Sequence, residues 1–142
     1  MTTSERIGRA FPVQDSLTAP YWQAAAQRRL VLPQRRDTQE FIWPPRYHGS
    51  NETDCGIRWV ESAGKGAIYS FSVVHRSSHP YPPVPYVLSV VHLDDGVYMT
   101  SNIVEVNPQD VIVGMAVEVT FEQLSVDVWL PVFRPLSRAL LA

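Results

Sequence analysis

Five side chains of this sequence belong to the types that most often bind metals or act as nucleophiles. They are the cysteine Cys55 and the histidines His48, His75, His79 and His92. A structural zinc site almost always needs four ligands close together, and these side chains are scattered along the chain. His75 and His79 have the i, i+4 spacing of a zinc-protease helix, but a strand-like segment precedes them and a proline follows at once. We therefore predict no metal site.

Nucleophilic or acid–base catalysis is the second chemistry that these residues suggest. Cys55 and His48 could form a cysteine–histidine pair, although no basic residue adjoins the cysteine. His75 or His79 could act as general acid and base with a carboxylate of the Asp-Asp-Gly segment at 94–96. That segment is also an ordinary hairpin turn. We assign no catalytic residue, and a histidine-based enzyme stays an alternative.

The charge pattern limits the partners of the chain. The net charge is −2, the isoelectric point is about 6.0, and the basic residues are eleven arginines and one lysine. A nucleic-acid-binding domain usually has a strongly basic balance or patch, so we expect no nucleic acid. Arginine forks suit phosphates and carboxylates, which makes Arg46, Arg76 and Arg134 candidates for phosphate recognition. A surface or packing role fits each of them equally well.

One amphipathic helix is predicted near the N-terminus and would position aromatic side chains. Thr18 can cap it, Pro20 suits its first turn, and the segment up to Leu30 has high helix propensity. Tyr21 and Trp22 would begin two rows of side chains along its surface. These aromatic residues fit packing on their own domain and docking on a partner equally well.

The remainder of the chain predicts short strands separated by turns. Strict alternation in the segment 67–76 would place Ile68 on one face and Tyr69 and Phe71 on the other. A chain of 142 residues with 45% hydrophobic content can bury its own core as one globular domain. The number of strands favours an oligonucleotide/oligosaccharide-binding (OB) barrel. The expected strands are 30–32, 58–62, 67–76, 86–93, 97–106, 116–122 and 128–134.

Several motifs follow one another in a specific order. After the Tyr-Trp helix come Leu-Val-Leu, Pro-Pro-Arg at 44–46, Trp-Val-Glu-Ser at 59–62, Gly-Lys-Gly at 64–66, a proline-rich loop, Leu-Asp-Asp-Gly at 93–96 and Phe-Arg-Pro at 133–135. Their order and spacing over about residues 17–136 resemble the DUF35 family of OB-fold, acyl-CoA-associated proteins. This resemblance implies a mainly β fold in which an N-terminal helix and a rubredoxin-like zinc ribbon precede a five-to-six-stranded OB barrel.

The resemblance also implies a division of the chain. We expect the ribbon-like segment to have lost its metal and therefore call it degenerate. The expected parts are a flexible arm at 1–14, the helix and a short strand at 15–33, the degenerate ribbon at 34–58, the OB domain at 59–136 and a tail at 137–142.

The four zinc-ligand positions of the family do not hold cysteines here. Aligned on the Pro-Pro-Arg block, they fall on Arg35, Thr38, Gly49 and Glu52, and Cys55 cannot hold a structural zinc ion alone. We expect no bound zinc. Zinc binding contributes on the order of 10 kcal/mol to such modules, so the segment has to be held by packing of its apolar residues or by a partner.

The resemblance implies an accessory subunit that binds acyl-CoA and docks on a thiolase-like enzyme, a lipid-transfer-protein-like aldolase or an acyl-CoA hydratase. The alternatives are a stand-alone hydratase or thioesterase that uses His75 or His79, and a nucleic-acid- or oligosaccharide-binding module. The residues expected to contact acyl-CoA are Arg46, Tyr69, Phe71, His75, Arg76, Tyr81, Tyr86 and Arg134. Those expected to contact the partner are Tyr21, Trp22, Trp43 and Arg46.

The remaining expectations concern assembly and location. A homodimer is possible on this reading, since nothing in the sequence fixes the oligomeric state. The single cysteine indicates a reducing compartment, and no run of about 18 apolar residues marks a membrane span. The N-terminal residues also lack the apolar core of a secretion signal. We therefore expect a cytoplasmic protein without a membrane partner.

Overall fold

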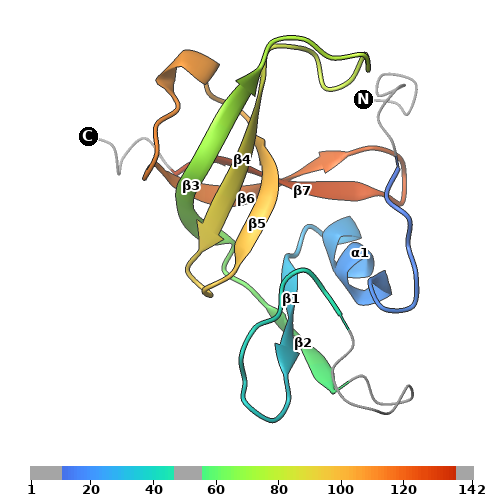
Figure 1. The fold of residues 1–142 in the computed structure, drawn as a ribbon. Coiled ribbons are helices and arrows are strands. Elements are labelled where there is room, and N and C mark those ends of the chain that lie inside the picture. The colour runs from blue at the N-terminus through green and yellow to red at the C-terminus, as the bar shows by residue number, and fades with distance from the viewer. Residues whose placement is uncertain (1–10, 47–55, 137–142) are drawn as a thin grey trace.

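The computed structural model describes residues 11–46 and 56–136, and these form one helix, seven strands and a 3-10 turn (Figure 1). The predicted fold class, a mainly β chain with an N-terminal helix and an OB-type barrel, is confirmed. No helix in the described ranges is long and apolar enough to cross a membrane. The elements are α1 (Ala19–Ala26), β1 (Val31–Arg35), β2 (Ile57–Glu61), β3 (Lys65–Val74), β4 (Tyr86–Leu93), β5 (Tyr98–Ile103), η2 (Pro108–Asp110), β6 (Ala116–Gln123) and β7 (Trp129–Pro135).

Five strands close into a barrel in the order β3-β4-β5-β7-β6. Neighbouring strands are antiparallel except β5 and β7, which meet in parallel at Ile103 and Phe133 and complete the closure. The interior is filled by aliphatic side chains and one aromatic ring, as expected for a small barrel whose inward positions form the core. These buried residues include Ile68, Val87, Val91, Leu93, Met99, Val117 and Phe133.

A β-bulge in β3 changes which of its side chains face the core. The register with β4 pairs Ile68 with Val91 and Ser70 with Val90, so Tyr69 is the extra residue of the bulge. Ile68 is buried, and Phe71, two pairs further along, packs against the same core. The prediction that Ile68 and Phe71 lie on opposite faces is therefore wrong, because strict alternation fails where a residue is inserted.

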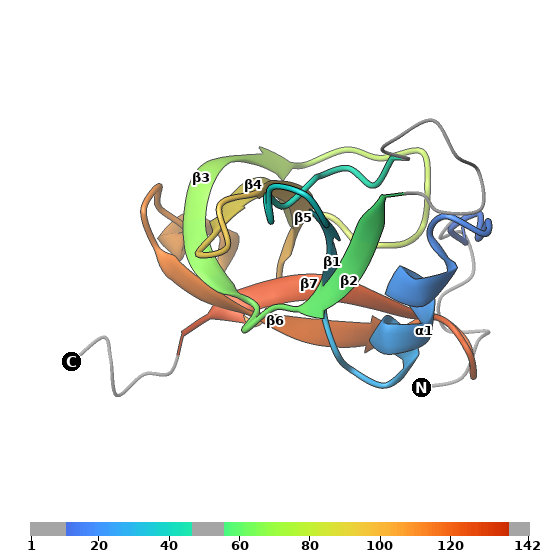
Figure 2. The same cartoon turned by 90° about the horizontal axis from the view of Figure 1, so that it is seen from below.

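A second, two-stranded sheet lies with α1 at one end of the barrel, and Figure 2 shows both from below. β1 and β2 are antiparallel, with Val31 opposite Glu61. The two strands overlap the two ends of the segment 34–58, for which a degenerate ribbon is expected. The Ser62 hydroxyl donates a hydrogen bond of 2.6 Å to Asp95 and accepts one of 2.9 Å from the Gly64 amide, which joins the end of β2 to the β4–β5 turn.

The helix begins where the sequence predicts it, but its cap is built differently. Thr18 occupies the N-cap position without bonding a helix amide through its side chain. Instead, the Asp15 carboxylate accepts bonds from the Thr18 amide at 2.8 Å and the Thr18 hydroxyl at 3.0 Å. The bond from the Thr18 amide is the main cause that lowers the pKa of Asp15 below its ordinary value.

Candidate functional site

A groove of about 390 Å³ lies where α1 and the start of the ribbon-like segment face the barrel. Its volume is within the range of small-molecule sites. Aromatic rings line one side and strands β4, β5 and β7 the other, so three parts of the fold distant in sequence have to come together to form it. The lining residues are Tyr21, Trp22, Trp43, Leu88, Thr100, Ser101, Asn102, Leu130, Pro131 and Val132.

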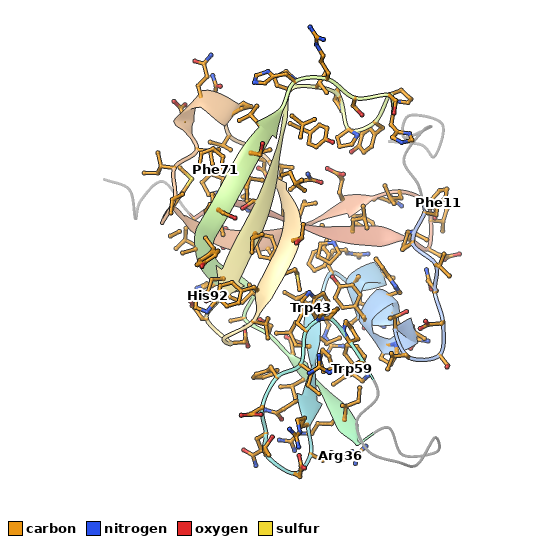
Figure 3. The ribbon with its side chains drawn as sticks, in the orientation of Figure 1. Phe11, Arg36, Trp43, Trp59, Phe71 and His92 are labelled. Atoms are coloured by element: carbon orange, nitrogen blue, oxygen red, sulfur yellow. The ribbon has the colours of Figure 1, made fainter. Side chains whose placement is uncertain are left out.

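The aromatic side of this groove is a packed cluster of three rings. The Tyr21 and Trp22 rings meet edge to face with centroids 5.0 Å apart, and the Tyr21 and Trp43 rings are tilted at 5.3 Å. Figure 3 shows Trp43 between the helix and the barrel. Three of the residues predicted to contact a partner, Tyr21, Trp22 and Trp43, are therefore brought together, whereas Arg46 is exposed at the edge of the described segment.

Tyr21 is buried to an unusual degree for a side chain with a hydroxyl group. Only 8% of its surface is exposed. Burial raises the pKa of the Tyr21 hydroxyl well above its ordinary value, because the ionised form would lose its hydration. No hydrogen bond from this hydroxyl to any other described residue is present.

The outer surface of β3, β4 and β5 is almost free of charge. Lys65, at the first position of β3, is the one Asp, Glu, Lys or Arg residue of these three strands. Large side chains stand out from the surface instead: the exposed fractions are 59% for Tyr69, 43% for Leu88 and 49% for Tyr98. Depletion of charge together with exposed aromatic residues is typical of the centre of a protein–protein interface. We call this surface the neutral face.

Three rings form a row at one end of the neutral face. His92 stacks on Tyr98 with centroids 4.3 Å apart and planes 8° from parallel, and Tyr98 meets Tyr69 edge to face at 4.9 Å. Tyr69, the inserted residue of the β3 bulge, is exposed beside Tyr98, and the cross-strand pairing of His92 with Tyr98 sets the stack. Figure 3 shows His92 near the β4–β5 turn.

The predicted acyl-CoA residues do not form one site in the structure. His75, Arg76 and Tyr81 follow β3 in the proline-rich loop and Tyr86 opens β4, at the end of the barrel away from the β1–β2 sheet (Figure 1). Tyr69 stands on the neutral face, and Phe71 packs against the core. Their role in binding acyl-CoA stays a prediction.

Arg134 is already engaged by two carboxylates. Its guanidinium lies 3.2 Å from Glu118 and 3.5 Å from Glu105. The hydrogen bond to Glu118 is the largest cause that raises the pKa of Arg134 above its ordinary value. A phosphate at this position would have to compete with both carboxylates.

The histidines that could support catalysis are isolated. His75 and His79 are exposed, and the described ranges hold no group of three or more His, Cys, Asp or Glu that could bind a metal ion. His48 and Cys55 lie outside the described residues, as do Gly49 and Glu52, two of the four positions at which the resemblance places zinc ligands.

The other two of these positions, Arg35 and Thr38, belong to a turn that is held by hydrogen bonds. The Arg35 guanidinium binds the Asp37 carboxylate at 3.1 and 2.9 Å, and the Thr38 hydroxyl accepts a bond from the Glu40 amide at 3.3 Å. The Arg35 amide also donates to the Glu40 carbonyl at 2.8 Å. These contacts close the turn within the chain itself.

Sequence reasoning missed several residues of the groove and of the neutral face. Leu88, Tyr98, His92 and Thr100 were assigned no role, because each appears in sequence as an ordinary strand residue. A signal was present: the segments 66–74, 86–93 and 98–103 contain no Asp, Glu, Lys or Arg, which is unusual for strands with an exposed face.

Comparison with known proteins adds the following similarities. Residues 59–122 match the family model described as ChsH2, C-terminal OB-fold domain. The chain is 32% identical to a solved structure named Ltp2-ChsH2(DUF35) aldolase, with a TM-score of 0.79 over 87% of this chain and 98% of that chain.

The two hydratase subunits among the curated relatives are longer than this chain. It is 35% identical over 130 residues to a probable enoyl-CoA hydratase alpha subunit of Thermomonospora curvata, which covers 89% of this chain and 40% of the relative. It is 31% identical over 104 residues to the 3-oxo-4,17-pregnadiene-20-carboxyl-CoA hydratase alpha subunit of Mycobacterium tuberculosis, covering 73% of this chain and 33% of that protein. A DUF35 domain-containing scaffold protein of Methanocaldococcus jannaschii is 36% identical over 69 residues, 48% of this chain and 49% of the relative. Each of these alignments thus covers less than half of the relative's length.

Proposed function

The chain belongs to the DUF35 family of OB-fold proteins, and from this membership we propose that it is an accessory subunit of an enzyme that acts on acyl-CoA. Its partner in this proposal is a hydratase or an aldolase, the two kinds of protein named among its relatives. The chain supplies binding surface, and the partner supplies the catalytic groups.

The neutral face is the observation that supports docking most directly. A solvated antiparallel strand usually alternates apolar and polar residues, since its outer side chains face water, and charged residues are the types most often exposed. β3, β4 and β5 instead expose tyrosine, leucine, serine and threonine side chains. Burying such a surface against a partner removes apolar area from water without desolvating unpaired charges. The occupant that we propose is therefore the hydratase or aldolase subunit.

The proposal extends to acyl-CoA as the shared ligand. The groove adjoins the neutral face, because Leu88 and Thr100 are exposed on β4 and β5 and also line the groove. A ligand in the groove would therefore lie beside the docked partner. Exposed Arg46 and Arg76 remain the candidates for the CoA phosphates.

The test is co-expression with the hydratase or aldolase of the same host, followed by size-exclusion chromatography and turnover of an enoyl-CoA or β-hydroxyacyl-CoA substrate. We expect a stable complex that is active where the accessory chain alone is not. Tyr98→Asp should abolish co-elution, because it places a charge in the contact. Val126→Asp is the matched control, since Val126 is 82% exposed on the loop between β6 and β7.

Two results would count against the proposal. If the Tyr98→Asp variant co-elutes with the partner as wild type does, the neutral face is not the docking surface. Turnover by the isolated chain that disappears in His75→Ala would favour the stand-alone enzyme instead.

A further inference from the structure

The Tyr21 hydroxyl is a buried hydrogen-bond donor that the described part of the chain leaves without a partner. Buried tyrosine hydroxyls usually find one, and leaving one unpaired costs about 1–3 kcal/mol. The Tyr21 ring packs against Trp22 and Trp43 and forms part of the groove wall. No described residue satisfies this hydroxyl, and the space that Tyr21 adjoins among the described residues is the groove.

The other polar groups that line the groove differ from Tyr21. The Ser101 hydroxyl donates to the Pro131 carbonyl at 3.0 Å, and the Asn102 amide donates to the Val87 carbonyl at 3.0 Å. Thr100 is exposed, so water can satisfy its hydroxyl. Among these polar lining groups, the Tyr21 hydroxyl is therefore the one that most needs a hydrogen-bond partner from a molecule in the groove.

The remaining lining sets the chemistry of that occupant. Two indole rings and aliphatic side chains of β4 and β7 make most of the wall, and no lining residue is charged. Such a site suits a ligand with an apolar body and one uncharged hydrogen-bond acceptor, whereas a free carboxylate would lose its hydration without gaining a cation.

We propose that the groove receives the acyl part of a thioester and that the Tyr21 hydroxyl donates a hydrogen bond to its carbonyl oxygen. This inference rests on the proposed function, since acyl-CoA supplies such a thioester, and it names Tyr21 as the residue that recognises it. Tyr21 positions the ligand by this bond and takes part in no bond-breaking step.

Loss of the Tyr21 hydroxyl should have opposite effects on stability and on binding. In the free protein, Tyr21→Phe removes an unpaired buried hydroxyl while keeping the ring contacts with Trp22 and Trp43. The variant should therefore unfold at the same temperature as wild type or a higher one. A hydroxyl with a purely structural hydrogen bond would give the reverse, because its loss would destabilise the fold.

The binding experiment compares two ligands that differ only at the acceptor. Octanoyl-CoA carries the carbonyl oxygen, and S-octyl-CoA, its thioether analogue, does not. Binding to the full chain is followed by calorimetry and by fluorescence, since Trp22 and Trp43 line the groove. We expect wild type to prefer octanoyl-CoA about three- to tenfold, the usual net effect of one hydrogen bond. Tyr21→Phe should bind both ligands equally.

The control variant is Thr100→Val, which deletes the exposed hydroxyl of the same groove and should keep the preference. The proposal fails if Thr100→Val rather than Tyr21→Phe removes it, if wild type does not distinguish the ligands, or if wild type binds neither. Fluorescence that responds to the partner subunit but not to octanoyl-CoA would also overturn it, because the groove would then hold protein. Co-elution with the partner is measured separately, so these failures leave the accessory role intact.

Discussion

Gly64 lies where the chain passes from the β1–β2 sheet into the barrel, and its replacement by alanine tests how closely these parts are joined. Its φ is +70°, in the left-handed region that favours glycine. A β-carbon at this position would lie 2.2 Å from Val119 Cγ1 and 3.0 Å from Val119 Cβ. The Val119 amide also donates a 2.7 Å hydrogen bond to the Gly64 carbonyl, which limits how far β6 can retreat.

The expected loss of stability has two parts. An alanine in the left-handed region costs about 1–2 kcal/mol, and forcing a methyl group into a packed contact costs about 1–3 kcal/mol. Gly64→Ala should therefore lower the free energy of unfolding by about 2–5 kcal/mol. Gly114→Ala isolates the first part, since Gly114 has φ +90° but no atom within 4 Å of the added β-carbon.

The assay is equilibrium unfolding in urea of both variants and wild type, with the midpoints compared at equal slopes. Gly64→Ala should unfold at a clearly lower urea concentration than Gly114→Ala. Val119→Ala removes the Cγ1 atom that the added methyl group would strike. The double variant Gly64→Ala/Val119→Ala should therefore lose less stability than the sum of the two single variants, which a double-mutant cycle measures. Equal losses for the two single variants would refute the steric reasoning and leave backbone conformation alone as the cause.

Two further predictions concern alkaline pH and zinc. Burial raises the pKa of Tyr21 in the folded protein. Below pH about 10, the ordinary pKa of tyrosine, the Tyr21 hydroxyl is protonated in both the folded and the unfolded state. Above it the unfolded state ionises first, so Tyr21 should remove about 1.4 kcal/mol of stability per pH unit. Urea unfolding at pH 9 to 11 measures this slope, and Tyr21→Phe should flatten it; an unchanged slope would contradict the burial argument. For zinc, elemental analysis of purified protein should find none in stoichiometric amount. One tightly bound equivalent would contradict the alignment that places Arg35 and Thr38 at former ligand positions.

Most of the fold could be read from local sequence patterns. The proline in the first turn and the run of good helix formers fix α1, and β-branched runs between turn residues fix the barrel strands. The strand expected at 30–32 continues through Pro33 to Arg35. Pro33 can belong to β1 because the edge of this strand away from β2 carries an isolated bridge at Gln34 and Phe41 and no continuous ladder, and there the Pro33 carbonyl accepts a bond from the Ile42 amide.

The candidate site was less accessible to sequence reasoning. Tyr21 and Trp43 could be named as aromatic anchors, because large aromatic residues in a short helix and a loop need burial. Their mutual contact, and the burial of the Tyr21 hydroxyl without a partner among the described residues, depend on how α1 packs against β1 and β7. No local pattern encodes such packing between segments far apart in the chain.

The sequence by itself determined the mainly β class, a helix near the N-terminus, the scarcity of charge along β3, β4 and β5, and the absence of cysteine at the four positions where the resemblance places zinc ligands. Only the tertiary structure decided that a bulge in β3 turns Phe71 toward the core, that Arg134 is paired with Glu118 and Glu105, and that three distant segments line one groove. The physical reason is the range of the interactions. Propensity and turn chemistry act between neighbours in sequence, whereas register, ion pairing and cavities arise where strands and helix meet in space.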